Sequence, residues 1–295
     1  ETISTNAYSL TKDGATVDIS PFTLTGVVLP ADTNDDPIKR LLFYEQADLD
    51  SFSVKMGDKP VFGLQKLHVD VTPPEEGKAM EFAGSAEKFS GDLSLVDDPQ
   101  AKAVIEALGY QNISGSFEME GSWQPTDGRM GLAQYDITID DAGTLGLTFD
   151  LGGYTPAFIK SLQDMQKQMA AAPEGADKSA QGLAMLGLMQ QLVFYTASVR
   201  YDDDSLTTKL LDFFAKQQGL SAADLANQVK ALVPFGMAQL NNPELTAQVT
   251  TAVSKFLDEP KSIEINAEPA QPVPFALIMA GGMSAPQDLP KTLGV

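Results

Sequence analysis

This chain has few residues for histidine or cysteine chemistry, because its 295 residues contain one histidine, His68, and no cysteine. His68 lies between Leu67 and Val69, in an alternating pattern that is typical of a strand. A zinc site there would need carboxylates for all of its other protein ligands. We therefore interpret His68 as a structural or surface residue, and we expect neither a metal site nor a cofactor.

The motifs of nucleophilic and nucleotide chemistry are also missing. The sequence has no G-x-S-x-G elbow and no S-x-x-K at a helix start, and a Ser-His-Asp triad would have to use His68. It also lacks the phosphate-binding loops G-x-x-x-x-G-K-[ST] and strand–G-x-G-x-x-G–helix. The sequence therefore favours a protein that is not an enzyme.

Paired carboxylates leave one catalytic alternative open. Glu118 and Glu120 share one face of a predicted strand, so a glycosidase mechanism with two carboxylates is formally available. Phe117 and Met119 point to the opposite face, which is the alternation expected of a strand with one solvated side. We favour the solvated strand and rank the carboxylate enzyme as the third hypothesis.

Two acidic clusters have the chemistry of calcium ligands. Asp32, Asn34 and Asp36 have the spacing of the first half of an EF-hand loop, but Pro37 replaces its glycine and Phe43 its bidentate glutamate. The segment 202–204 is three aspartates at a predicted helix start, where carboxylates also stabilise the helix dipole. Calcium binding stays open at both clusters.

The charge balance excludes nucleic acid as a partner. The 40 acidic residues outnumber the 20 basic residues, which gives a formal net charge of −20. Such a chain is repelled by phosphate backbones and by anionic membrane surfaces. No run of apolar residues is long enough to span a bilayer, so we expect no integral membrane span.

The compartment is predicted from two compositional features. A chain without cysteine is compatible with an oxidising bacterial periplasm. The sequence begins with Glu1 and not with methionine, so either a signal peptide has been removed or the chain is a fragment. We expect a periplasmic or secreted protein of a Gram-negative bacterium.

The first half of the chain, residues 1–152, is predicted to be β-rich. Apolar and polar residues alternate, and turns rich in Gly, Pro and Asp separate the alternating segments. One short helix is expected near 98–109, with Asp98 as its N-cap, Pro99 in its first turn and Gly109 at its end. The three strands of 110–152 predict an antiparallel meander. The other expected strands are 15–20, 22–29, 41–54, 61–71, 80–82 and 93–96.

The second half, residues 153–295, is predicted to be mainly helical. The change falls at Gly152-Gly153, although strands on both sides of it could belong to one sheet, so the halves are either two domains or one. Helical spacing of apolar residues predicts helices at about 158–169, 180–193, 206–218, 222 onward and 243–259. Strands are expected at 196–201 and 262–267.

Methionine is the one positive functional signal. Seven of the eleven methionines lie in the helical half, on stripes that they share with Leu, Phe and Val. Methionine adapts to varied apolar partners, so these stripes predict a pocket for an apolar ligand, although a plain core is the favoured interpretation of any single methionine. The predicted pocket residues are Phe158, Leu162, Met165, Met169, Met185, Met189, Leu210 and Phe214.

We expect an α+β fold in which a curved antiparallel sheet, mostly from the first half, packs on amphipathic helices, mostly from the second. Strands such as 22–29 and 145–151, bounded by Gly, Pro and Asp turns, give the chain a similarity to AsmA-like bacterial envelope proteins. That resemblance implies a long sheet that cradles lipid. Our first hypothesis is a periplasmic carrier for a lipid or other apolar molecule. The alternative is a structural or protein-interaction module of the envelope without a ligand.

Overall fold

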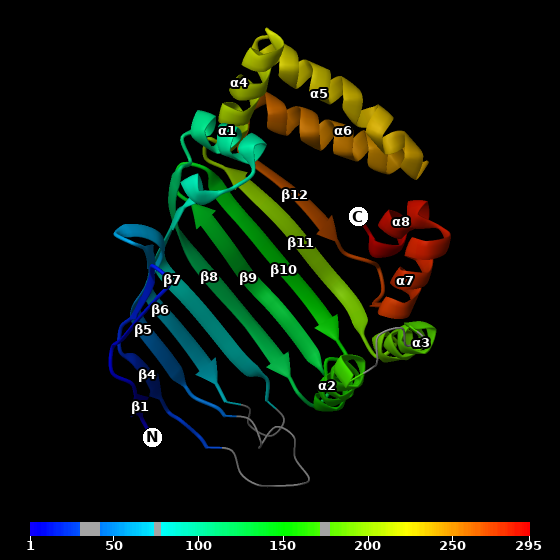
Figure 1. Ribbon diagram of the computed structural model, residues 1–295. Coiled ribbons are helices and arrows are strands. Elements are labelled where there is room, and N and C mark those ends of the chain that lie inside the picture. The colour runs from blue at the N-terminus through cyan, green and yellow to red at the C-terminus, as the bar shows by residue number, and fades with distance from the viewer. Residues whose placement is uncertain (30–41, 74–77, 172–177) are drawn as a thin grey trace.

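The computed structural model describes residues 1–29, 42–73, 78–171 and 178–295, and within them thirteen strands form one open antiparallel sheet (Figure 1). The expected α+β fold is confirmed. The strands are β1 (Ile3–Ser4), β2 (Tyr8–Lys12), β3 (Ala15–Ile19), β4 (Phe22–Thr25), β5 (Gln46–Met56), β6 (Lys59–Thr72), β7 (Met80–Asp92), β8 (Asn112–Gln124), β9 (Arg129–Ile139), β10 (Gly143–Gly152), β11 (Val193–Asp203), β12 (Ser262–Ala267) and β13 (Val273–Pro274).

The helices interrupt the strands at their ends and follow one another in the C-terminal half. The helices are α1 (Pro99–Leu108), α2 (Pro156–Ala171), α3 (Lys178–Met189), α4 (Leu206–Gln218), α5 (Ala222–Met237), α6 (Pro243–Asp258), α7 (Phe275–Ser284) and α8 (Leu289–Leu293). Three-residue 3₁₀ turns are η2 (Leu93–Leu95), η3 (Ala238–Leu240) and η4 (Pro286–Asp288).

The sheet grows in chain order. From β5 to β12, each strand pairs antiparallel with the next strand along the chain. At the N-terminal edge, β3 pairs with residues 52–56 of β5 and β4 pairs with residues 46–49, so the two are halves of one strand broken at Ser20-Pro21. Strand β10 precedes the predicted boundary at Gly152-Gly153 and β11 follows it. Because the two strands pair, both sides of that boundary belong to one sheet.

Capping residues set the helix ends as the sequence indicates. The Asp98 side chain accepts a hydrogen bond from Ala101 N at the start of α1, and Gly109 adopts the left-handed conformation at its end. Ser221 caps α5 through Asp224 N, and Asn242 caps α6 through Leu245 N. These side chains accept hydrogen bonds from main-chain N–H groups of the first helical turn, which have no acceptor within the helix.

Several predicted boundaries are wrong. Residues 93–96 do not form a strand, because η2 lies there and the Asp92 side chain accepts a hydrogen bond from Ser94 N. The strand expected at 80–82 continues to Asp92 as β7. The helix expected to reach 193 ends at Met189, and β11 begins at Val193. At 83–86 and 183–189, small or uniformly apolar residues give no contrast between two faces, whereas Leu93, Ser94 and Leu95 do alternate and the cap at Asp92 overrides their pattern.

Much of the molecule's apolar area stays uncovered. The accessible surface is 18211 Å² for 31.5 kDa, whereas a compact monomer of this mass exposes about 12,000 Å². Phe158 is the largest side chain that is fully buried among the described residues. The open sheet, which does not close into a barrel or pack on a second sheet, accounts for this excess.

Helices surround the sheet instead of covering it. In Figure 1, α1 and α4 lie at one end of the strands, α2 and α3 lie at the other end, and α5 to α8 lie beyond β12. The α5–α6 hairpin reaches the C-terminal helices, because η3 contacts η4. The helices therefore form a frame on three sides of the sheet. Within the described residues, no helix combines the length and the apolar character that crossing a bilayer requires.

Candidate functional site: the apolar face of the sheet

One face of the sheet is apolar along its whole width. The antiparallel register places one apolar residue of each strand opposite the next, from β5 through β12. Because side chains of directly opposed residues point to the same side, these residues form one row on one face. In chain order, the row is Leu49, Leu67, Ala86, Phe117, Ile137, Leu145, Tyr201 and Ile263.

The opposite face is polar in the adjoining row. Shifting each position by one residue gives a second continuous row of opposed partners, and six of its eight members are charged or ionisable. This row is Asp48, His68, Ser85, Glu118, Asp136, Gly146, Arg200 and Glu264. The alternation of Phe117 with Glu118 is therefore the alternation of two faces, as the sequence predicts, and Glu118 belongs to a broad polar surface.

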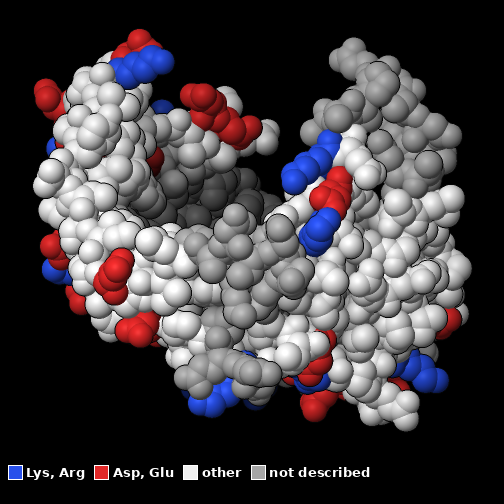
Figure 2. Space-filling view, turned by 90° about the horizontal axis from the view of Figure 1, so that it is seen from below, with Lys and Arg blue, Asp and Glu red and all other residues white. Residues whose placement is uncertain are grey.

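Helix α6 reaches the apolar side of the sheet. The ring of Phe256 in α6 packs edge-on against Tyr201 of the apolar row, with 6.2 Å between the ring centroids. Figure 2 looks along this side and shows a hollow between two walls, in which the visible surface is mostly free of Lys, Arg, Asp and Glu. Charged residues lie on the rims and on the outside. The apolar face of the sheet therefore forms the floor of this hollow.

Large apolar side chains on the floor remain in contact with solvent. Val199 and Ile265 oppose each other on β11 and β12, and they are 46% and 61% exposed. Leu145 on β10 is 48% exposed. Fully covering one such side chain contributes roughly 1.5–3 kcal/mol, so this part of the floor would gain from an apolar ligand that lies across it.

The α2–α3 end of the frame is closed by a small core. Phe158, Leu188 and Leu192 are buried together, and Leu162, Met165 and Met189 pack against them. Trp123 on β8 donates a hydrogen bond from Nε1 to the carbonyl of Tyr154 at 2.8 Å, which joins this end of the frame to the sheet.

The structure divides the eight predicted pocket residues into two groups. Six lie on α2 and α3, where Phe158, Leu162, Met165 and Met189 share the core just described, Met185 is half-buried and Met169 is exposed. Leu210 and Phe214 lie on α4, which follows β11 at the opposite end of the strands, roughly 35 Å away by strand rise. The structure does not bring the eight residues into one pocket.

The helix-based prediction missed the strand residues of the floor. Leu145, Val199 and Ile265 come from three strands separated by up to 120 positions. Their common signal is period-two alternation, which the sequence shows clearly at 145–151 and at 262–267. The alternation identifies an apolar face, but only the pairing of the strands shows that the three residues are neighbours.

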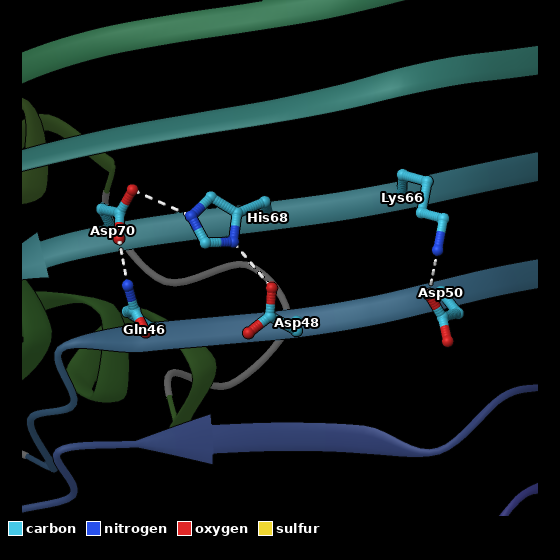
Figure 3. A network of polar contacts seen from close by, with 6 residues as sticks. All are labelled: Gln46, Asp48, Asp50, Lys66, His68 and Asp70. Atoms are coloured by element: carbon cyan, nitrogen blue, oxygen red, sulfur yellow. Dashed lines mark hydrogen bonds and ion pairs between the residues drawn. The ribbon is translucent and has the colours of Figure 1, made fainter.

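On the polar face, His68 lies between two carboxylates (Figure 3). Its Nδ1 is 2.6 Å from Asp48 Oδ1 and its Nε2 is 2.9 Å from Asp70 Oδ2, and Gln46 Nε2 donates to Asp70 at 3.1 Å. Hydrogen bonds to Asp48 and then to Asp70 raise the pKa of His68 above its usual 6.5. Hydrogen bonds from Gln46 and then from His68 lower the pKa of Asp70.

This cluster is a network of partly exposed side chains joined by hydrogen bonds. Among the described residues, no group of three His, Asp or Glu side chains could hold a metal ion. Asp32, Asn34 and Asp36, the first candidate calcium ligands, lie outside the described residues. In the second acidic segment, Asp203 Oδ1 accepts hydrogen bonds from Thr207 N and from the Tyr201 hydroxyl. That carboxylate therefore caps α4, as the helix-dipole interpretation expects.

A family model described as "Uncharacterized protein" matches residues 136–295, which is more than half of the chain. The chain belongs to this family. The match begins within β9 and includes β10 to β13 and the frame helices α2 to α8. The matched region of this chain therefore includes the exposed floor residues Leu145, Val199 and Ile265. No curated protein matches the chain.

Proposed function

We propose that the protein binds a lipid acyl chain, or another elongated apolar molecule, along the floor of the hollow. The observation that supports this proposal is the apolar face of the sheet, on which Val199 and Ile265 oppose each other two residues along the strands from the apolar row and remain exposed. Soluble monomers rarely leave such a contiguous apolar surface unless a ligand or partner covers it.

The length of the floor suits an acyl chain better than a compact ligand. Adjacent strands are about 4.8 Å apart, so the eight strands of the apolar row span roughly 34 Å. The described floor offers no charged side chain within this row, so it provides apolar contact without fixing a headgroup. This chemistry favours a carrier with broad selectivity among apolar molecules, and we propose that role without any enzymatic step.

Native mass spectrometry of the purified protein, followed by organic extraction and lipid analysis, tests this proposal. A stoichiometric adduct that is extracted as phospholipid or fatty acid is the expected result. A clean apo mass, together with no saturable binding of a fluorescent fatty acid, would contradict it.

The decisive variants place a charge on the floor. Ile265→Glu and Val199→Glu should each weaken fatty-acid binding by about tenfold or more, because a carboxylate would have to lose its water under the acyl chain. Asn266→Glu is the matched control, since it adds the same charge to the same strand β12 on the polar face. Equal loss of binding in the control and in Ile265→Glu would count against the floor as the site.

A structural role in the envelope is the second candidate, and one observation favours it. The edge strand β2 is exposed along all five residues, including Tyr8 and Leu10, so its outer main-chain groups are open to pairing with another strand. Cross-linking to a partner chain through β2, in protein that carries no lipid, would favour this candidate. A location outside the cytoplasm remains a prediction under both candidates.

A further inference from the structure

Two helical segments combine low charge with strongly exposed apolar side chains. Leu232 and Phe235 on α5 are 64% and 76% exposed, and Leu277 and Met283 on α7 are 59% and 80% exposed. These four residues are called the tip patch below. Single exposed apolar residues are common on proteins, but four large ones on two helices whose following turns, η3 and η4, contact each other are not explained by chance exposure.

The surroundings of the tip patch are nearly free of charge. Residues 231–254 contain one charged residue, Glu244, and residues 271–287 contain none, whereas 20% of the whole chain is charged. Sixteen residues, 255–270, separate these two stretches in the sequence, and η3 and η4 bring them into contact. Figure 1 shows the end of the α5–α6 hairpin beside α7 and α8. The fold therefore assembles one neutral, apolar region on an otherwise acidic protein.

The shape and the charge of this region favour a lipid surface as its occupant. The exposed side chains come from a helical hairpin and from a helix near its end, and the two stretches that carry them hold one charged residue, Glu244, with Lys230, Lys255 and Asp288 at their borders. A stable protein interface would normally surround such a core with a polar rim. Helices that present Phe and Leu insert shallowly into the boundary between headgroups and acyl chains. Because the chain carries a net charge of −20, the surface that fits is an uncharged bilayer and not an anionic one.

We propose that the tip patch docks the protein on the surface of an uncharged lipid bilayer, so that an apolar ligand can pass between the bilayer and the hollow. The passage of ligand depends on the function proposed above, whereas the docking itself does not. The position of the patch supports the link, because α5 and α7 belong to the frame that surrounds the floor.

Flotation with phosphatidylcholine vesicles tests the docking. The wild-type protein should float with pure phosphatidylcholine vesicles, should gain nothing from added phosphatidylglycerol, and should be insensitive to salt. The double variant Leu232→Asp/Phe235→Asp should lose about tenfold in the bound fraction. Leu10→Asp/Met56→Asp is the matched control, because it changes two exposed apolar residues at the other edge of the sheet, and it should float like the wild type.

Three results would overturn the proposal. The first is wild-type protein that stays with the aqueous phase, and the second is a double variant that floats like the wild type. The third is light scattering that shows a dimer which Leu232→Asp/Phe235→Asp dissolves, because the tip patch would then be covered by a second copy of the chain.

A second readout separates docking from ligand binding. In the absence of vesicles, Leu232→Asp/Phe235→Asp should bind a fluorescent fatty acid as the wild type does, while Ile265→Glu should not. Ile265→Glu should still float with phosphatidylcholine vesicles. Loss of flotation in Ile265→Glu, with normal flotation of the tip-patch variant, would place the membrane contact on the floor and refute docking through the tip patch.

Discussion

The indole of Trp123 donates its hydrogen bond across the end of the sheet, from β8 to the Tyr154 carbonyl two residues before α2 begins. Trp123 is almost fully buried, and it is the only tryptophan of the chain. This hydrogen bond, together with the one from Tyr154 N to the carbonyl of Gly128, holds the α2–α3 end of the frame against the sheet.

Replacing Trp123 with phenylalanine keeps an aromatic ring but removes the donor. We expect Trp123→Phe to lower the free energy of unfolding by about 1–3 kcal/mol, because the Tyr154 carbonyl loses its partner in a partly buried position. Trp123→Ala should cost about 3–5 kcal/mol, since it also leaves a cavity. Urea denaturation followed by far-UV circular dichroism measures both. No measurable cost for Trp123→Phe would show that the hydrogen bond contributes nothing to stability.

Gly153 should tolerate no side chain. Its φ is +84°, and a Cβ atom there would lie 1.8 Å from the carbonyl oxygen of Gln191. Gly57 is the matched control, because its φ of +60° is also left-handed but no heavy atom lies within 4 Å of its Cβ position. Gly57→Ala should cost about 1–2 kcal/mol through backbone strain alone. Gly153→Ala should cost several times more or prevent folding, as thermal unfolding would show; similar melting temperatures would contradict this.

The pH dependence of His68 has a definite sign. Because its folded-state pKa is raised above 6.5, the stabilisation from its network is complete below that value and is lost as the pH rises through the folded pKa. NMR titration is direct, since the chain has one histidine. The midpoint should lie above 6.5 and should fall in both Asp48→Asn and Asp70→Asn. A midpoint at or below 6.5 in the native protein would refute the network in Figure 3.

Arg129 should not be replaceable by lysine. Its Nε and Nη2 both donate to the Asp150 carboxylate, and its guanidinium lies 3.3 Å from the centroid of the Tyr195 ring. A lysine keeps the charge but loses the two-pronged geometry and the flat stacking, so Arg129→Lys should cost about 1 kcal/mol. Lys66→Arg, at an exposed pair with Asp50, should change stability by less than about 0.5 kcal/mol. Chemical denaturation that ranks the two the other way would be inconsistent with the stacked pair.

The sequence predicts the elements well where two local signals agree. The helix near 98–109 is confirmed because Asp98, Pro99 and Gly109 mark both of its ends. The meander of 110–152 is confirmed because alternating strands are joined by short turns. β7 was underestimated because Ala83, Gly84 and Ala86 are too small to give an alternating hydrophobic signal, although they oppose Val69, Met119 and Phe117 in the sheet.

The candidate site was less predictable for a different reason. Helical spacing correctly shows that Phe158, Leu162 and Met165 share a face, but this spacing is the same for a core as for a pocket. The floor depends on which strands pair, and pairing is a long-range property that single-strand patterns do not encode. Thus Val199 and Ile265 are recognised as neighbours only once β11 and β12 are seen side by side.

The sequential pairing of β5 to β12 has a consequence for how the protein is made. Up to β10, no more than 19 residues separate a strand from its partner, so little loop-closure entropy opposes the addition of each strand, whereas 40 residues separate β10 from β11 and 58 separate β11 from β12. The sheet can then form from its N-terminal edge during translation. The apolar face of the sheet would be exposed to solvent during most of translation, because α4 to α8 are synthesised after β11. A nascent chain of this kind is a natural client for a holding chaperone until the C-terminal helices arrive.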